Sequence, residues 1–229
     1  VAIGRGALFA QNFTSATSNQ NVGVGYHAGT NITTGVQNTL IGGNAGDALT
    51  DADYNVAIGK GALTTDTLGN RSVAIGAAAL ASQNFTSATN SYNVAVGYDA
   101  GVSVTTGLRN TLIGGEAGDA LTTGYNNVAV GQGALGGDTQ GQQSIAIGRN
   151  ALLNQNFTSG TDVYNVAIGP SAGAAITTGT ENTLIGALAG DSLTDADLNV
   201  AIGSSALSSD TLGSASVAIG KGALAVQNF

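Results

Sequence analysis

The sequence predicts an all-β fold, a parallel β-solenoid of about 13 coils, and three observations lead to it. Closely similar sequence segments begin at Val1, Val73, Ile145 and Val217, so the chain has a 72-residue repeat. Each segment divides into one 21-residue unit and three 17-residue units, and every unit opens with a short β-type run that ends in glycine. No stretch shows apolar residues at sustained helical spacing, so we expect strands and turns without helices.

The 13 units share a pattern that holds along the whole chain. In every unit the third residue is Ile or Val, the fourth is Gly and the seventh is Ala, and Asn or Ser precedes each of the twelve later units. β-branched residues favour extended backbone, glycine suits a bend that a Cβ disfavours, and Asn or Ser suits a turn. Seventeen residues are too few for a strand with a crossover helix but enough for one coil, and stacked coils lie about 4.8 Å apart. The units begin at Val1, Val22, Thr39, Val56, Val73, Val94, Thr111, Val128, Ile145, Val166, Thr183, Val200 and Val217.

The repeat array is continuous, which predicts one domain over residues 1–229. The chain begins with Val1 rather than Met, and neither end carries the polar cap that solenoids need. We therefore expect a fragment of a longer fibre. The array consists of three super-repeats and a partial one, at residues 1–72, 73–144, 145–216 and 217–229.

Composition excludes several classes of protein and partner. Charged residues make up only 9% and hydrophobic residues 42%, which does not fit a disordered chain. One Pro excludes collagen, and the lack of Cys excludes a disulfide scaffold. No apolar run approaches the roughly 20 residues of a membrane helix, so we expect no membrane insertion. The net charge of -8 argues against a nucleic-acid partner.

The alternation of side chains along each run predicts two faces. We expect the first and third residues, such as Val22 and Val24, to form a buried inner ladder, and the second residue to point away from them. The second residue is small or apolar in every unit, which favours packing against sister chains over a solvated surface. The alternative is a coil covered on both sides by its own loops. The predicted interface residues are Leu40, Leu112, Leu184, Ala2, Ala57, Ala74 and Ala129.

The tandem motif N/S-V-A-I-G-x-x-A, as at Ser72-Val73-Ala74-Ile75-Gly76, resembles the head domains of trimeric autotransporter adhesins. The motif N-T-L-I-G-x-x-A-G at 38–46, 110–118 and 182–190 is similar to repeats in long fibre proteins of bacteria and tailed phages. The resemblance implies a left-handed, laterally packed β-roll, assembled as a homotrimer and displayed outside the cell or on its surface. The units here are longer than adhesin-head coils, and the 21-residue unit carries an insertion ending in Q-N-F.

Calcium is the one cofactor that the sequence brings into consideration. Clustered loop oxygens are what Ca²⁺ requires, and two D-x-L-T-D-A-D segments supply carboxylates, whereas the middle block lacks two of the three. The alternative is that these residues form solvated turns. We likewise expect Asp66, Asp138 and Asp210 to bond nearby backbone in turns. The calcium candidates are Asp47, Asp51, Asp53, Asp191, Asp195 and Asp197.

Nothing in the sequence converges on a catalytic centre. The single histidine, His27, is replaced by Asp99 and Ser171 at the equivalent positions of the next blocks, and we expect it to be a surface residue. We therefore expect no enzyme and no catalytic residues. The phenylalanines of the Q-N-F motif are expected to fill a gap beside the insertion or to contact a neighbouring chain; they are Phe13, Phe85, Phe157 and Phe229.

The function that fits these observations is a structural segment of an extracellular filament or adhesive fibre, a stiff rod with attachment as a second role. Its expected partner is itself, as a homotrimer or an end-to-end filament, and any receptor is left open. A virion tail-fibre segment is the alternative. An ice-binding or other ligand-binding solenoid fits less well, because the Thr pairs such as Thr33-Thr34 recur once per super-repeat and form no continuous ladder.

Overall fold

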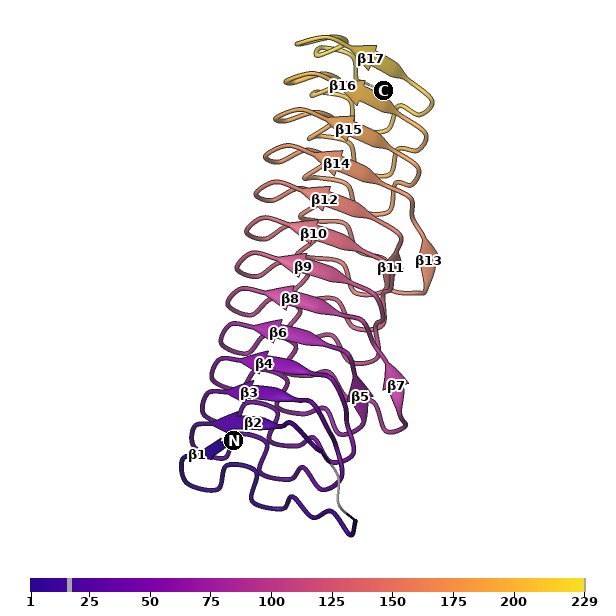
Figure 1. The fold of residues 1–229 in the computed structure, drawn as a ribbon. Coiled ribbons are helices and arrows are strands. Elements are labelled where there is room, and N and C mark those ends of the chain that lie inside the picture. Colours follow the sequence, from indigo (N-terminus) through magenta and orange to yellow (C-terminus); the bar gives the residue numbers. More distant parts are fainter. Residues whose placement is uncertain (16–17, 229) are drawn as a thin grey trace.

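The chain forms a rod of stacked coils in a computed structural model, which describes residues 1–15 and 18–228 (Figure 1). One strand from each unit joins a 13-stranded parallel sheet that runs the length of the rod, so the predicted all-β solenoid is confirmed. The described residues contain no helix. The strands of this sheet are β1 (Ala2–Ile3), β2 (Val22–Val24), β3 (Thr39–Ile41), β4 (Val56–Ile58), β6 (Val73–Ile75), β8 (Val94–Val96), β9 (Thr111–Ile113), β10 (Val128–Val130), β12 (Ile145–Ile147), β14 (Val166–Ile168), β15 (Thr183–Ile185), β16 (Val200–Ile202) and β17 (Val217–Ile219).

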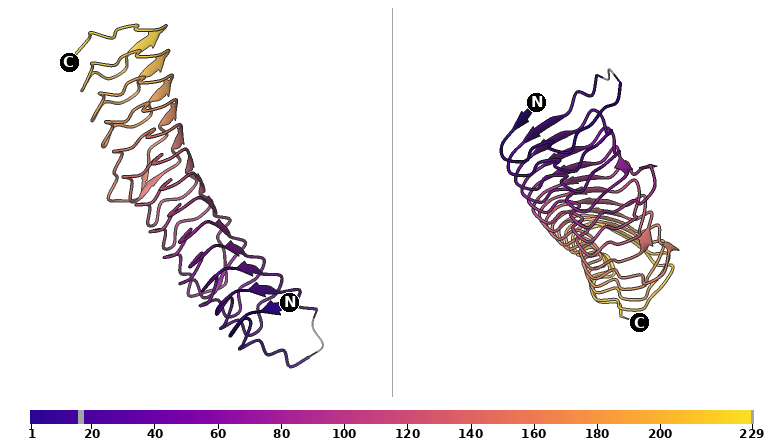
Figure 2. Two further views of the ribbon diagram at one scale, coloured as in Figure 1. Left: turned by 90° about the vertical axis from the view of Figure 1, so that its left-hand side faces the viewer. Right: turned by 90° about the horizontal axis from the view of Figure 1, so that it is seen from below.

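Two short ladders accompany the 21-residue units that begin at Val73 and Ile145. β5 (Gly69–Asn70) pairs with β7 (Thr89–Asn90), and β11 (Gly141–Gln142) pairs with β13 (Thr161–Asp162), both in parallel. These ladders lie on the side of the coil away from the loops that leave the main strands, and the two termini lie at opposite ends of the rod (Figures 1 and 2).

Equivalent residues of successive units lie beside one another in the main sheet. Val56, Ala57 and Ile58 of β4 pair with Val73, Ala74 and Ile75 of β6, and the same register holds along the stack. The fourth residue of each unit then turns the chain with a φ between 121° and 147°, a conformation that glycine adopts readily. Its N–H donates to the preceding coil, as in the 2.7 Å bond from Gly76 N to Ile58 O.

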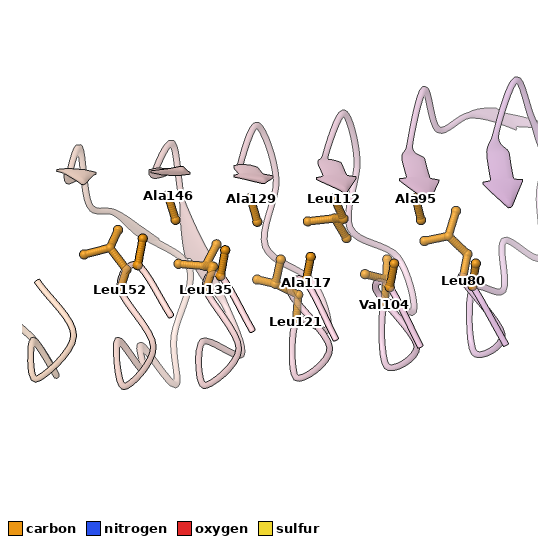
Figure 3. Packing of buried hydrophobic residues seen from close by; sticks show 14 of the residues in the cluster. Leu80, Ala95, Val104, Leu112, Ala117, Leu121, Ala129, Leu135, Ala146 and Leu152 are labelled. Carbon is orange, nitrogen blue, oxygen red and sulfur yellow. The ribbon is translucent and has the colours of Figure 1, made fainter. Parts of the chain in front are cut away.

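The two faces of the strands are the reverse of those predicted. The second residue of each run points into the coil, as Ala95, Leu112, Ala129 and Ala146 do in Figure 3, and these four are completely buried. The first and third residues lie on the outside and remain partly exposed. The predicted interface was therefore wrong for Leu40, Leu112, Leu184, Ala57, Ala74 and Ala129, which are all 0% exposed; Ala2, in the first coil, is exposed.

The second residue of each run faces the narrow interior of the coil, and the size of the residues opposite it varies to match its own size. Where the second residue is Leu112, glycines face it: a Cβ on Gly101 would lie 2.6 Å from Leu112 Cδ1, and one on Gly118 would lie 2.7 Å from Cδ2. Where the second residue is Ala129, the residue six positions on is the buried Leu135. Leu40 and Leu184 have the same glycine partners, so core packing repeats every four coils.

The asparagines before the strands are buried and connect one coil to the next. The backbone N–H of Asn55 donates to Asn38 Oδ1 at 2.9 Å, and Asn38 Nδ2 donates to the carbonyl of Ala52 at 2.7 Å. Their side chains therefore bond to the neighbouring coil and across their own coil, rather than forming only the local turn that was expected. This ladder satisfies polar groups that would otherwise be costly to bury.

Two of the four phenylalanines of the Q-N-F motif are buried, which favours the predicted gap-filling role over contact with a neighbouring chain. Phe85 and Phe157 are 7% and 8% exposed, and Phe13 is half-buried. Phe229 lies outside the described residues.

Candidate functional site

The outer surface of the main sheet is the most continuous surface feature of the rod. We call it the outer face and define it as the first and third residues of the 13 units, which are Val, Ile or Thr throughout. Ile113, Ile147 and Ile168, in the middle of the stack, are 39%, 37% and 36% exposed. An apolar strip that passes over every coil is unusual on a monomeric protein.

Where the chain approaches each strand, a row of side chains borders the outer face, and aromatic and basic residues occupy it from the fourth to the seventh coil. We call this row, two residues before each strand, the N-terminal edge; its backbone is left-handed, with φ values of 52–63° at Tyr54, Arg71, Tyr92 and Arg109. The Arg71 guanidinium carbon lies 4.7 Å from the centre of the Tyr54 ring and 6.0 Å from that of Tyr92. These cation–π contacts connect Arg71 to the tyrosines of the coils on both sides of it.

The opposite border carries acidic side chains at its centre. We call this border, the fifth and sixth residues of each unit, the C-terminal edge; it includes Tyr98, Asp99 and Glu116. A hydrogen bond with Asp99, followed by the negative charges of Asp99 and Glu116, raises the pKa of Tyr98. Among residues 1–15 and 18–228, neither Asp99 nor Glu116 forms an ion pair, so this acidic patch is uncompensated within the chain.

The predicted surface residue His27 also lies on the C-terminal edge. Its ring stacks on Tyr26 with 4.1 Å between ring centroids, and it is half-buried. It lines a hollow of about 280 Å³ together with Arg5, Phe9 and Thr30. A second hollow on this edge is lined by Tyr26, Gly43, Asn44 and Lys60.

The structure does not bring the calcium candidates together. Within the described ranges there is no group of three or more His, Cys, Asp or Glu side chains that could hold a metal ion. Thr64, Thr34 and Thr178 hydroxyls donate to Asp47, Asp51 and Asp195, each at 2.5 Å. The backbone N–H groups of Val36 and Thr180 donate to Asp53 and Asp197, at 2.8 and 2.7 Å. Asp191 Oδ1 is buried and has no hydrogen-bond partner in the part of the chain that the structure describes.

A second set of acids lies inside the coil. Asp66, Asp138 and Asp210 are completely buried, and each accepts a bond from the backbone N–H three residues later, as predicted for a turn. The side chains of Gln83 and Gln155 also donate to Asp66 and Asp138, each at 2.6 Å. Gln83 and Gln155 lie in 21-residue units, where they continue the hydrogen-bonded ladder of the buried asparagines. Sequence reasoning missed this role.

The buried Asp138 predicts stability that falls as the pH rises. Burial raises the pKa of Asp138, although bonds from Gln155, Phe157 and Gly141 oppose the shift. Its protonated form therefore favours folding, and this contribution is complete below the unfolded carboxyl pKa of about 3.9 and is lost as pH rises through the folded pKa. The melting temperature is expected to rise on acidification from neutral pH, and to rise less in Asp138→Asn. An equal rise in both proteins would remove Asp138 as the cause.

No helix in the described part of the chain is long and apolar enough to cross a membrane. Comparisons with protein-family models, curated proteins and solved structures give no match. The resemblance to adhesin heads and phage fibres therefore stays a prediction that rests on the repeated motifs themselves.

Proposed function

We propose that this chain is a structural segment of an extracellular fibre, a stiff rod that associates laterally with copies of itself through the outer face. The observation that carries the proposal is the apolar strip of Val, Ile and Thr side chains, which stays at least partly exposed in every coil. Its borders are enriched in Tyr and Arg, the residues that protein interfaces favour.

The dimensions of the outer face are sufficient for a stable interface. Thirteen strands about 4.8 Å apart make a face roughly 60 Å long, and three residues at about 3.3 Å each make it about 10 Å wide. With both edges included, the buried surface reaches about 800 Å² on each chain, the area that one side of a specific pairwise interface needs. Three chains are the number that the resemblance implies, and display on a cell surface or a virion fits the same rod.

A mechanical role also follows from how the coils are joined. Backbone hydrogen bonds link each coil to the next in the main sheet, and the buried asparagines add side-chain bonds between the same coils. Such a rod resists bending because every coil contacts its neighbours over its whole cross-section. It is suited to hold a binding tip away from a surface, and this role requires neither a catalytic residue nor a cofactor.

Ile113→Asp is expected to weaken lateral association, since it places a charge at the centre of the apolar face. Thr123→Asp is the matched control: the equivalent residues are Asp51 and Asp195, so the fold accepts a carboxylate there. Sedimentation should give a multiple of 22.3 kDa for the unaltered chain and for Thr123→Asp, and a smaller mass for Ile113→Asp. Thermal unfolding checks that both variants fold. A monomeric unaltered chain, or a folded Ile113→Asp of unchanged mass, would overturn the proposal.

A further inference from the structure

The outer face alone does not specify how two copies align. Its Val, Ile and Thr side chains repeat from coil to coil, so copies displaced along the rod, or running in opposite directions, bury nearly the same apolar surface. Information about alignment must come from residues that differ between coils. The two edges carry such residues, because only there do charged side chains border the face.

Symmetry decides which edges meet. When copies are related by rotation about an axis parallel to the rod, the N-terminal edge of one copy faces the C-terminal edge of the next, coil against equal coil. When a two-fold axis crosses the rod instead, each edge faces itself. The seventh of the 13 coils, which contains β9, is the centre of the stack. A crossed arrangement centred there places Arg109 against Arg109 and Glu116 against Glu116.

We propose that copies of this chain associate in parallel and in register, with Arg109 of one copy facing Glu116 of the neighbouring copy. Both residues flank the same strand, β9, from opposite edges, and neither has an ion-pair partner among the described residues of its own chain. Asp99, one coil before Glu116, adds a second negative charge to the surface that Arg109 would meet. This inference rests on the proposed lateral association and adds the relative direction of the associated chains.

The same edges disfavour displacement by one whole super-repeat, which is the shift that the repeat would otherwise permit. In register, Arg71 faces the small side chain of Ala77. Displacement by four coils places Arg71 against Arg5 in one direction and against Arg149 in the other. Like charges brought together across an interface are strongly unfavourable, so the edges select one alignment.

Charge reversal tests the pairing. Arg109→Glu and Glu116→Arg are each expected to weaken association at least about tenfold, and the double variant is expected to recover most of that loss, since close charge pairs across interfaces couple strongly. Arg149→Glu is the control, because Arg149 would face the neutral Gln143 in register. Sedimentation equilibrium at low salt measures the three variants and the control.

The outcomes separate this inference from the proposed function. If the unaltered chain associates but the single reversals do not weaken it, or the double variant shows no recovery, the parallel alignment is overturned and lateral association stands. If the unaltered chain is a monomer, both fail.

A spin label gives a second, independent measurement of direction. The chain has no Cys, so Ser204→Cys on the exposed C-terminal edge of the twelfth coil provides a single labelling site. Parallel copies place the labels at equal height. A crossed arrangement places them about ten coils apart, roughly 50 Å along the rod, and that result would overturn the inference.

Discussion

Gly131→Ala is expected to destabilise the rod by about 4 kcal/mol or more, one of the largest effects of any single substitution in the chain. Gly131 is the fourth residue of its unit, with a φ of 133°, and an added Cβ would lie 2.6 Å from both the carbonyl carbon and oxygen of Gly148 in the next coil. Those atoms belong to backbone that is fixed by the sheet. Strain and clash therefore act together at the centre of the stack.

The matched control for Gly131→Ala is Gly43→Ala. Gly43 has no left-handed φ, and nothing lies within 4 Å of an added Cβ; the equivalent residues Ala77 and Ala187 already carry one. This variant is expected to be as stable as the unaltered chain or slightly more stable, since alanine restricts the unfolded chain. Denaturant unfolding followed by circular dichroism compares the three proteins. Equal midpoints for Gly131→Ala and Gly43→Ala would contradict the proposed role of the glycine row.

Leu112→Ala is expected to cost about 2–5 kcal/mol, because it leaves a cavity that glycines on either side do not fill. The chain itself shows how to repair the loss. In the next coil Ala129 is combined with Leu135, whose φ of 55° is nearly that of Gly118, at 57°. Leu112→Ala with Gly118→Leu recreates that pair and is expected to recover part of the stability, because Leu121 Cδ1 would lie 3.0 Å from the new Cβ and must shift.

The single variant Gly118→Leu completes the double-mutant cycle. With Leu112 present, the new side chain would overlap Leu112 Cδ2, so this variant is expected to be destabilised by overpacking. Denaturant unfolding of all four proteins measures the coupling between the two positions. Additive losses in the double variant would show that the two side chains do not share one space. Leu112→Asp, by contrast, buries a charge and reports on folding rather than on association.

Sequence reasoning found the coil, the register and the glycine bends because all three depend on backbone periodicity. It assigned the strand faces in reverse because both faces are apolar: alternation distinguishes Val73 and Ile75 from Ala74, but not which side lies inside. The signal that decides the matter is size. Leu112 is matched by glycines and Ala129 by a leucine, a compensation that only an enclosed space imposes.

The edges of the outer face were missed for a different reason. Residues such as Arg71 and Arg109 change from unit to unit, so a search for repeated positions passes over them. Their importance depends on standing beside an apolar face, which could not be recognised while that face was thought to be buried. The calcium candidates share a sequence segment but not a location, because the coil spreads them along its path.

The four-coil packing period of the core determines how such a rod can change in length. Removing the coil that begins at Val94 would place Leu112 beside Leu80 in place of Gly101, whereas removing one whole super-repeat restores the order of alanine- and leucine-bearing coils. In-frame recombination between blocks would therefore lengthen or shorten the rod in steps of about 19 Å while the core packing is kept. The length of the rod can therefore change by whole numbers of super-repeats, through duplication or deletion of blocks.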